Sequence, residues 1–370
     1  MFSWKAVSVC LGAAVLMMIV PTANATGAFI GPFNHVQTIA STVPRNGDVN
    51  PYGVAVVPAS HGRLVAGNIL VSNFNDSANL QGTGTTIVQI TPSGTRHVFA
   101  HILRTELPGP CPGGIGLTTA IVSLSSGWVI VGSLPTKNGR SGTARAGCLL
   151  VLNDNGKVVK TISGAPIRGP WDMTADDAGS TATLFVTNVL NGTVANSPAT
   201  VNNGTVDRIV LTINPGMKPV VSSQTVIGTG FGERTDPAAL VVGPTGVGLA
   251  LNGTLYVADS VANRIVSIAN ALTTVTSTTG TVVSTGGDLN TPLGLAIAPN
   301  GDILTTNAAD GNLVETTTAG LQVAVKMLDT SPTPPGPNGA GTLFGLAVTP
   351  GQDGVYFVDD GTNTLNLLHQ

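Results

Sequence analysis

A small group of aromatic and polar side chains has the chemistry to hold a ligand. Each member lies where a turn passes into a short apolar run, which is where a β-strand begins. The group comprises Asn50, Tyr52, Trp171, Asp172, Asp236, Asn290 and Phe344. Aromatic rings with a few polar groups suit a neutral, partly apolar or sugar-like ligand, which they bind by stacking and hydrogen bonding. In the alternative interpretation, the rings fill a narrow channel and bind nothing.

Asp172 is the best candidate for a catalytic acid or base. It follows Trp171 directly and stands where corresponding segments of the chain carry Gly. A carboxyl group against an indole face has a raised pKa, because low polarity disfavours the charged form. If the protein is an enzyme, Asp172 is the residue that we expect to transfer the proton.

The composition excludes several classes of function. The chain has 370 residues, of which 9% are charged, with 16 Lys and Arg against 19 Asp and Glu. An average soluble domain has about 25% charged residues. A nucleic-acid binder with a basic surface is therefore excluded, as is a charged disordered tail. Hydrophobic residues at 42% are enough for a sizeable core, and the 47 Gly and 24 Pro favour strands and turns over helices.

The N-terminus has the pattern of a secretory signal peptide. Lys5 is followed by an uncharged apolar run, Ala6 to Val20, and then by Ala23-Asn24-Ala25. The run is shorter than the ~20 residues of a membrane-spanning helix and fits the apolar part of a signal peptide. We predict a signal peptide over residues 1–25, cleaved after Ala25, and a single domain over residues 26–370 that is secreted or periplasmic.

Two cysteines, Cys111 and Cys148, remain after that cleavage. Pairs of thiols in exported proteins commonly oxidise, so we expect a disulfide between these two residues. Two buried free thiols are the alternative.

Self-similarity is the strongest signal in the chain. Six segments join a turn to an apolar run: Asn50–Val57, Cys111–Thr118, Arg168–Ala175, Asp236–Val242, Thr291–Ala298 and Thr342–Thr349. A second apolar run follows each of them, such as Leu255–Asp259, and then a third, such as Thr86–Ile90, Cys148–Leu152 or Arg264–Ile268. An amphipathic fourth run completes the unit. Four short strands per unit, repeated at about 50–65 residues, predict the blades of a β-propeller.

The two ends of the chain complement each other. The last unit stops after its third strand, Thr364–Leu368, and an isolated strand, His35–Ala40, precedes the first unit. We therefore predict an all-β, six-bladed β-propeller with four-stranded blades. The N-terminal strand is expected to join the last blade and close the ring, which leaves no long unpaired edge between the first and last blades.

The segment from Leu255 to Ile265 (Leu-Tyr-Val-Ala-Asp-Ser-Val-Ala-Asn-Arg-Ile) resembles an NHL-type repeat, and the other units are similar but degraded. The resemblance covers residues 35–369. It implies the six-bladed β-propeller superfamily that includes gluconolactonase-like enzymes, streptogramin B lyases and strictosidine-synthase-like proteins. Because one fold hosts both enzymes and binding scaffolds, the resemblance implies architecture more strongly than function.

The calcium-dependent lactonases of this superfamily carry Glu, Asn or Asp where several inner strands open. The matching residues here are Tyr52, Gly113 or Ile115, Trp171, Ala238, Leu293 and Phe344. None of them offers the carboxylate or amide oxygen that calcium requires. The five histidines, none on a predicted inner strand, are His35, His61, His97, His101 and His369. We therefore expect no metal site, no cofactor and no histidine base in the channel.

Two functions follow from these observations. Clear repeats without a recognisable catalytic constellation favour a secreted binding or interaction module, whose partner is an unidentified small molecule or protein. The fold resemblance alone favours the alternative, a lactonase-, lyase- or strictosidine-synthase-like enzyme that acts on a small molecule at the central channel. We expect no nucleic acid among the partners and no membrane span, and we expect a monomer.

Overall fold

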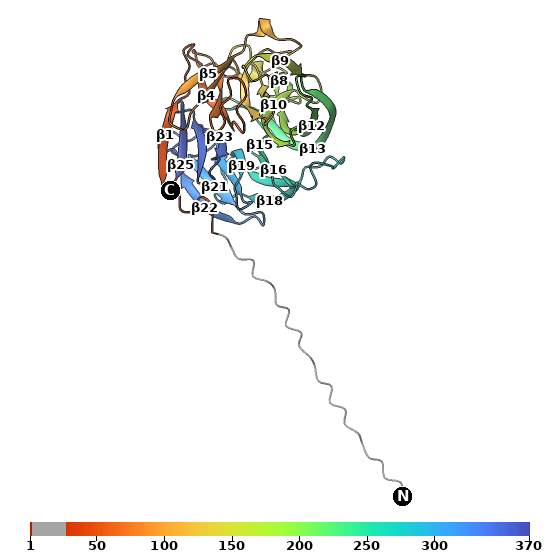
Figure 1. Ribbon diagram of the computed structural model, residues 1–370. Helices are drawn as coiled ribbons and strands as arrows, with labels where there is room; N and C mark the ends of the chain where they lie inside the picture. The colour runs from red at the N-terminus through yellow and green to blue at the C-terminus, as the bar shows by residue number, and fades with distance from the viewer. Residues whose placement is uncertain (2–26) are drawn as a thin grey trace.

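The computed structural model of the chain describes Met1 and residues 27–370 (Figure 1). The predicted signal peptide, residues 1–25, lies outside these described residues except for Met1. Among the described residues, no helix is both long enough and apolar enough to cross a membrane. The same residues form six antiparallel sheets around a common centre (Figure 1).

Each sheet, or blade, runs from an inner strand at the centre to an outer strand at the rim. The first blade contains β2 (Val49–Val56), β3 (Ile69–Asn75), β4 (Thr86–Ile90) and β5 (Arg96–His101). The second contains β6 (Leu117–Ser123), β7 (Val129–Ser133), β8 (Cys148–Leu152) and β9 (Val158–Ile162). The third contains β10 (Gly169–Asp177), β11 (Thr181–Val189), β12 (Val201–Thr212), β13 (Val220–Asp236) and β14 (Leu240–Val242).

The fourth blade contains β15 (Pro244–Leu249), β16 (Leu255–Asp259), β17 (Arg264–Ile268) and β18 (Thr281–Thr285). The fifth contains β19 (Pro292–Ile297), β20 (Ile303–Asn307), β21 (Asn312–Thr316) and β22 (Gln322–Met327). The sixth contains β23 (Leu343–Val348), β24 (Gly354–Asp359), β25 (Thr364–His369) and β1 (His35–Ser41). Three short helical turns are η1 (Arg104–Glu106), η2 (Ser141–Thr143) and α1 (Thr193–Asn196).

The predicted six-bladed β-propeller is confirmed. Three predicted strands, Thr86–Ile90, Cys148–Leu152 and Arg264–Ile268, coincide with β4, β8 and β17. Every residue of β4 and β8 is buried, because strands inside a blade are covered on both faces by neighbouring blades. The outer strand β22 alternates half-buried and exposed residues, as expected where only one face of a blade edge is covered.

Two predicted starts of units are wrong. The segment Asp236–Val242 is not an inner strand, because the Asp236 carboxylate accepts the N–H groups of Ala238 and Ala239 and forms a hairpin between β13 and β14. This hairpin gives the third blade a fifth strand, so not every blade has four. The segment Cys111–Thr118 is largely a loop, and the inner strand of its blade begins at Leu117. Ile115 supplies the apolar signal there by packing between blades one and two.

The inner strands pack backbone against backbone around the centre, where the labels β10, β15, β19 and β23 stand in Figure 1. A Cβ atom at Gly294 would lie 2.1 Å from the carbonyl oxygen of Phe344 in the next blade. One at Gly345 would lie 2.3 Å from the carbonyl oxygen of Tyr52. Glycine at these positions therefore allows the ring to close around a narrow channel.

The N-terminal part of the described chain is attached to the last two blades. β1 pairs antiparallel with β25, with His35 opposite His369 and Ser41 opposite Thr364. Ahead of β1, the N–H groups of Phe29 and Ile30 donate hydrogen bonds of 2.7 and 2.8 Å to the Glu315 carboxylate. Ile30 is fully buried in the cluster between blades five and six. That folding depends on this N-terminal attachment stays a prediction.

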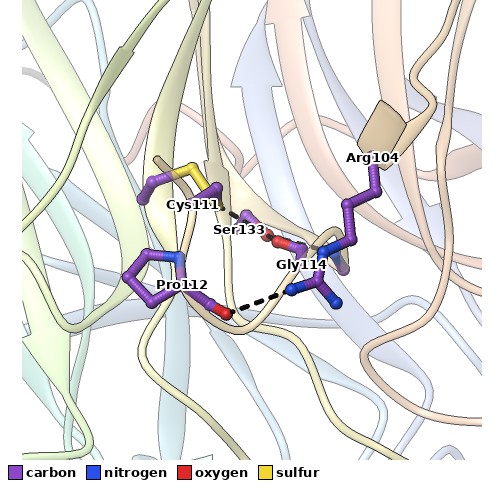
Figure 2. Close-up of a disulfide and its surroundings, with 7 residues drawn as sticks. Arg104, Cys111, Pro112, Gly114 and Ser133 are labelled. Atoms are coloured by element: carbon purple, nitrogen blue, oxygen red, sulfur yellow. Dashed lines mark hydrogen bonds between the residues drawn. A yellow bond between two sulfur atoms is a disulfide. The ribbon is translucent and has the colours of Figure 1, made fainter. Parts of the chain in front are cut away.

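The predicted disulfide between Cys111 and Cys148 is present (Figure 2). It ties the loop before β6 to the first residue of β8. Around it, Arg104 donates a hydrogen bond of 3.5 Å to the Pro112 carbonyl, and Ser133 Oγ donates one of 2.9 Å to the Gly114 carbonyl. Both sulfur-bearing residues are buried. A disulfide is compatible with the predicted extracellular location.

We expect replacement of both cysteines by Ala to lower the free energy of unfolding by about 3–4 kcal/mol, because the unfolded chain regains the freedom of a loop of this size. The bridge spans a sequence separation of 37 residues. Urea denaturation of the double variant and of the oxidised parent measures the difference. Reduction should also raise the intact mass of the parent by the mass of two hydrogens, and an unchanged mass would refute the bridge.

Candidate functional site

The central channel contains a cavity of about 380 Å³. It is lined by the C-terminal halves of the six inner strands, including Val54, Ile121, Asp172, Val247, Leu295 and Leu346. Most of these side chains are apolar, and the channel is open on the face where the inner strands end. The geometry suits a small molecule with an apolar surface.

A plug of aromatic rings closes the channel on the opposite face, where the inner strands begin. Tyr52 stacks on Phe74 at 4.3 Å and on Phe344 at 3.9 Å between ring centroids, so both of its faces are covered. Trp171 lies 6.2 Å from Tyr52, and its Nε1 donates a hydrogen bond of 2.9 Å to the Val241 carbonyl. Each of these rings is at most 2% exposed. The structure therefore brings Tyr52, Trp171 and Phe344 together, with their faces turned toward one another.

The hairpin between β13 and β14 completes this plug. Leu240 and Val241 pack in the same cluster as Tyr52 and Trp171, together with Leu293. Ala238, which the sequence aligned with the opening residue of an inner strand, instead lies in the turn of the hairpin. The hairpin signal was present in the sequence as Asp236-Pro237, a favoured turn opening, but the apolar run after it resembled an inner strand.

Asp172 lies on the cavity side of the plug. β10 has a bulge between Pro170 and Met173, so the side chains of Trp171 and Asp172 point in different directions. The Asp172 carboxylate accepts a hydrogen bond of 3.1 Å from the N–H of Val247 in the next blade, and the residue is 7% exposed. Burial raises the pKa of Asp172 to about 7, against the opposing effect of N–H bonds from Met173 and Val247. A group with this pKa can both donate and accept a proton near neutral pH.

The position of Asp172 is exceptional among the inner strands. Gly53, Gly246, Gly294 and Gly345 occupy the corresponding places in four other blades. In the other blades these glycines allow two backbones to come into close contact. In the third blade the Asp172 carboxylate takes the place of that contact and accepts a hydrogen bond from the Val247 N–H of the neighbouring inner strand. The presence of Asp in place of Gly is visible in the sequence, and it is the reason why the sequence predicts Asp172 as a site residue.

The predicted polar residues at the opposite rim make local hydrogen bonds and an ion pair with neighbouring residues. The N–H of Asn50 donates to Asn363 Oδ1 at 2.7 Å, and Asn50 itself is buried. Asn290 Nδ2 donates to Asp310 Oδ2 at 2.9 Å. Asp236 forms an ion pair of 2.7 Å with Arg234. These three residues are thus separated from Asp172 by the plug, and their role as ligand contacts stays a prediction.

Two hydroxyl groups that sequence reasoning missed line the same cavity. Thr119, on β6, is 4% exposed, and its Oγ1 has no hydrogen-bond partner among the described residues. Ser123 Oγ, further along β6, also lacks one within that part of the chain. Both oxygen atoms are themselves buried. Since buried hydroxyls usually have partners, they represent unused hydrogen-bonding capacity beside the cavity. The sequence offered no signal for them, because it placed the inner strand of this blade before residue 118.

Residues 27–370 contain no group of three or more His, Cys, Asp or Glu side chains arranged to hold a metal ion. The residues aligned with the calcium ligands of the lactonases fall in the plug or in loops. Tyr52, Trp171, Leu293 and Phe344 form apolar contacts there, while Gly113 and Ile115 precede β6.

Comparison with known proteins gives a likeness of fold. No protein-family model matches the sequence, and no curated protein matches it. A solved gluconolactonase from Xanthomonas campestris has a TM-score of 0.52 and 13% identity, covering 90% of this chain and 89% of that chain. A luciferin-regenerating enzyme has a TM-score of 0.52 and 11% identity, covering 91% and 95%.

A third solved structure, the calcium-binding protein regucalcin from Agrobacterium tumefaciens, has a TM-score of 0.52 and 13% identity, covering 90% of this chain and 93% of that chain. At identities this low, the three likenesses establish architecture alone. They agree with the sheet topology and with the resemblance found in the sequence. The chain is therefore a six-bladed β-propeller of the architecture seen in gluconolactonase-like proteins.

Proposed function

We propose that the protein is an enzyme that acts on a small, neutral molecule in the channel cavity, with Asp172 as its general acid or base. The observation that carries this proposal is the Asp172 carboxyl, buried at the closed end of an open cavity with a pKa of about 7. Carboxyl groups held neutral in apolar pockets are a recurrent means of proton transfer in enzymes. Acyl-ester or lactone chemistry needs one such group and a hydroxyl or water to attack or leave.

Three further features support this function. Thr119 and Ser123 line the cavity and carry hydroxyls without partners among the described residues, which can orient a carbonyl or a water molecule once their side chains rotate toward it. Burial of Asp172 lowers the polarity around its carboxyl, which strengthens hydrogen bonds made there. Two of the structurally similar proteins are described as enzymes, a gluconolactonase and a luciferin-regenerating enzyme.

The second candidate function is ligand binding without catalysis, and one observation favours it. The only hydrogen bonds of the Asp172 side chain within residues 27–370 come from backbone N–H groups, so the carboxyl has no charged partner to tune it. Under this function the same cavity holds a ligand, and Asp172 serves only to bind it.

Turnover of a panel of γ- and δ-lactones and p-nitrophenyl esters tests the two functions. We expect a pH–rate profile with an inflection near 7, the pKa of Asp172, and we expect Asp172→Asn to reduce kcat by about 100-fold or more. Asp176→Asn, an exposed carboxyl on the same strand, serves as the control and should leave the profile unchanged. Ligand binding without turnover would favour the binding module, and full turnover in Asp172→Asn would refute Asp172 as the general acid or base.

The raised pKa of Asp172 also predicts a dependence of stability on pH. Its pKa is about 7 in the folded protein against the ordinary 3.8. The stability contributed by the neutral carboxyl is therefore fully present below about pH 4 and is lost as the pH rises through about 7. Asp207, Glu233 and Asp360 have pKa values raised in the same direction, so the parent protein alone cannot isolate Asp172.

The difference between the parent and Asp172→Asn does isolate it. Asn retains an oxygen that can accept the Val247 N–H and carries no charge at any pH. We expect the free energy of unfolding of Asp172→Asn, relative to that of the parent, to increase by a few kcal/mol between pH 4 and pH 8. Urea denaturation of both proteins at each pH measures this change. A difference that does not change with pH would show that Asp172 is ionised in the folded protein.

A further inference from the structure

An apolar groove adjoins the mouth of the channel cavity. It has a volume of about 590 Å³ and is lined mainly by Leu249, Leu251, Ile297, Pro299, Val348 and Pro350. These residues lie in or beside the hairpins that follow the inner strands β15, β19 and β23, in three consecutive blades. Leu251 stands at the tip of its hairpin and is fully exposed. Contiguous apolar residues at the surface, as in this groove, mark places where a ligand or partner binds.

The groove and the cavity lie next to each other and share part of their walls. Leu249 and Ile297 line both of them. A molecule whose polar end reaches Asp172 can therefore extend along these two side chains into the groove. The cavity of about 380 Å³ is too small for a long chain, and the groove offers further apolar room beyond it.

The walls of the groove are formed by three hairpins, each closed by a hydrogen bond within its own backbone. Ala250, Ala298 and Thr349 each accept the N–H that closes the turn, at 2.9 Å in all three cases, from Gly253, Gly301 and Gln352. The backbone bonds of each hairpin are thus satisfied within it. A preformed groove loses little freedom when a ligand enters, which favours binding.

The opposite side of the mouth is polar. There the Asp177 carboxylate accepts the N–H of Ser125 at 2.6 Å, and His61 Nε2 lies 2.8 Å from the Ser125 carbonyl oxygen. These residues belong to the corresponding loops of blades one to three. Because one half of the mouth is apolar and the other half is polar, an apolar tail has a single favourable direction in which to leave the cavity.

We propose that the ligand of the channel is an elongated neutral amphiphile, with a carbonyl head at Asp172 and an unbranched hydrocarbon tail in the groove of blades four to six. The proposal rests on the proposed function, since it assigns a substrate class to the same cavity. The head contacts Asp172. The tail runs past Leu249 and Ile297 to Leu251.

A homologous series of N-methyl alkanamides with 4 to 10 carbons tests this inference, because these probes carry the carbonyl head and are not hydrolysed. Isothermal titration should show affinity for the purified protein rising about fourfold with each methylene that enters the groove. Leu251→Glu should remove most of this rise for the longer probes and leave the shortest probe unaffected. Leu80→Glu, an exposed leucine on the face of the plug, is the matched control and should keep the rise.

The outcomes separate this inference from the proposed function. Affinity that does not change with chain length, or a rise that survives in Leu251→Glu, would overturn the amphiphile while leaving lactone or ester turnover by Asp172 intact. A rise with chain length in a protein without turnover would leave the amphiphile and refute the enzyme. Self-association abolished by Leu251→Glu, seen in sedimentation without any effect of chain length, would assign the groove to a second copy of the chain and overturn the proposal.

Discussion

A chain that lacks residues 26–41 is expected not to fold cooperatively. The deletion removes β1, so β25 becomes an unpaired edge strand that is apolar and prone to aggregate. It also removes Ile30 and Phe33, which are 0% and 5% exposed in the cluster between the last two blades. Loss of these two side chains alone costs about 3–6 kcal/mol. Proteins of this kind are stable by only about 5–15 kcal/mol, so the deletion removes a large part of the total.

Thermal unfolding of residues 26–370 and of residues 42–370, followed by circular dichroism, measures this effect. The short chain should show no cooperative transition, and a synthetic peptide of residues 27–41 should restore one. Glu315→Gln is an informative intermediate, because it weakens the bonds from Phe29 and Ile30 while keeping β1 in place. If residues 42–370 melted at the same temperature as residues 26–370, the N-terminal strand would not be needed to complete the ring.

The second large effect is expected for Trp171→Ala, which should lower the free energy of unfolding by about 3–5 kcal/mol. Trp171 is 2% exposed and packs against Tyr52, Leu240 and Val241. Its removal leaves a cavity in the plug and deprives the Val241 carbonyl of its hydrogen-bond donor. The loss should be seen in urea denaturation as a lower midpoint with an unchanged slope.

Trp171→Phe is the matched comparison for this variant. It keeps an aromatic ring in the plug but removes the Nε1 bond to Val241 and part of the buried ring volume, so it should cost about 1–3 kcal/mol, less than Trp171→Ala. A ring that served to bind ligand on an open rim would behave differently, since exposed side chains change stability by less than about 0.5 kcal/mol when substituted. A small effect of Trp171→Ala would therefore refute the plug.

The repeat in the sequence was enough to predict the blades, because the strands inside a blade are short apolar runs bounded by turns and their pattern is local. β4, β8 and β17 begin and end where the sequence predicts. The prediction was wrong where a loop had the same apolar pattern as an inner strand. Ile115 and the run from Leu240 to Val242 are apolar because they pack against neighbouring blades, and a local pattern does not distinguish such a loop from an inner strand.

The candidate site was predictable only in part. Asp172 was found from the sequence because it replaces Gly in a repeat, which is a comparison of positions along the chain. Thr119 and Ser123 were not found, because the register of β6 depends on how the loop tied by Cys111 and Cys148 is folded. The groove around Leu251 was not found either, because its three walls come from three different blades.

The sequence by itself determined the architecture of this protein, the disulfide partners and the exceptional carboxyl in one inner strand. The tertiary structure decided on which side of the aromatic rings that carboxyl lies, and that the rings are covered. The physical reason is that burial of Tyr52, Trp171 and Phe344 results from contacts between blades that are more than a hundred residues apart along the chain. No local pattern records such contacts, and the site exists only where six inner strands converge.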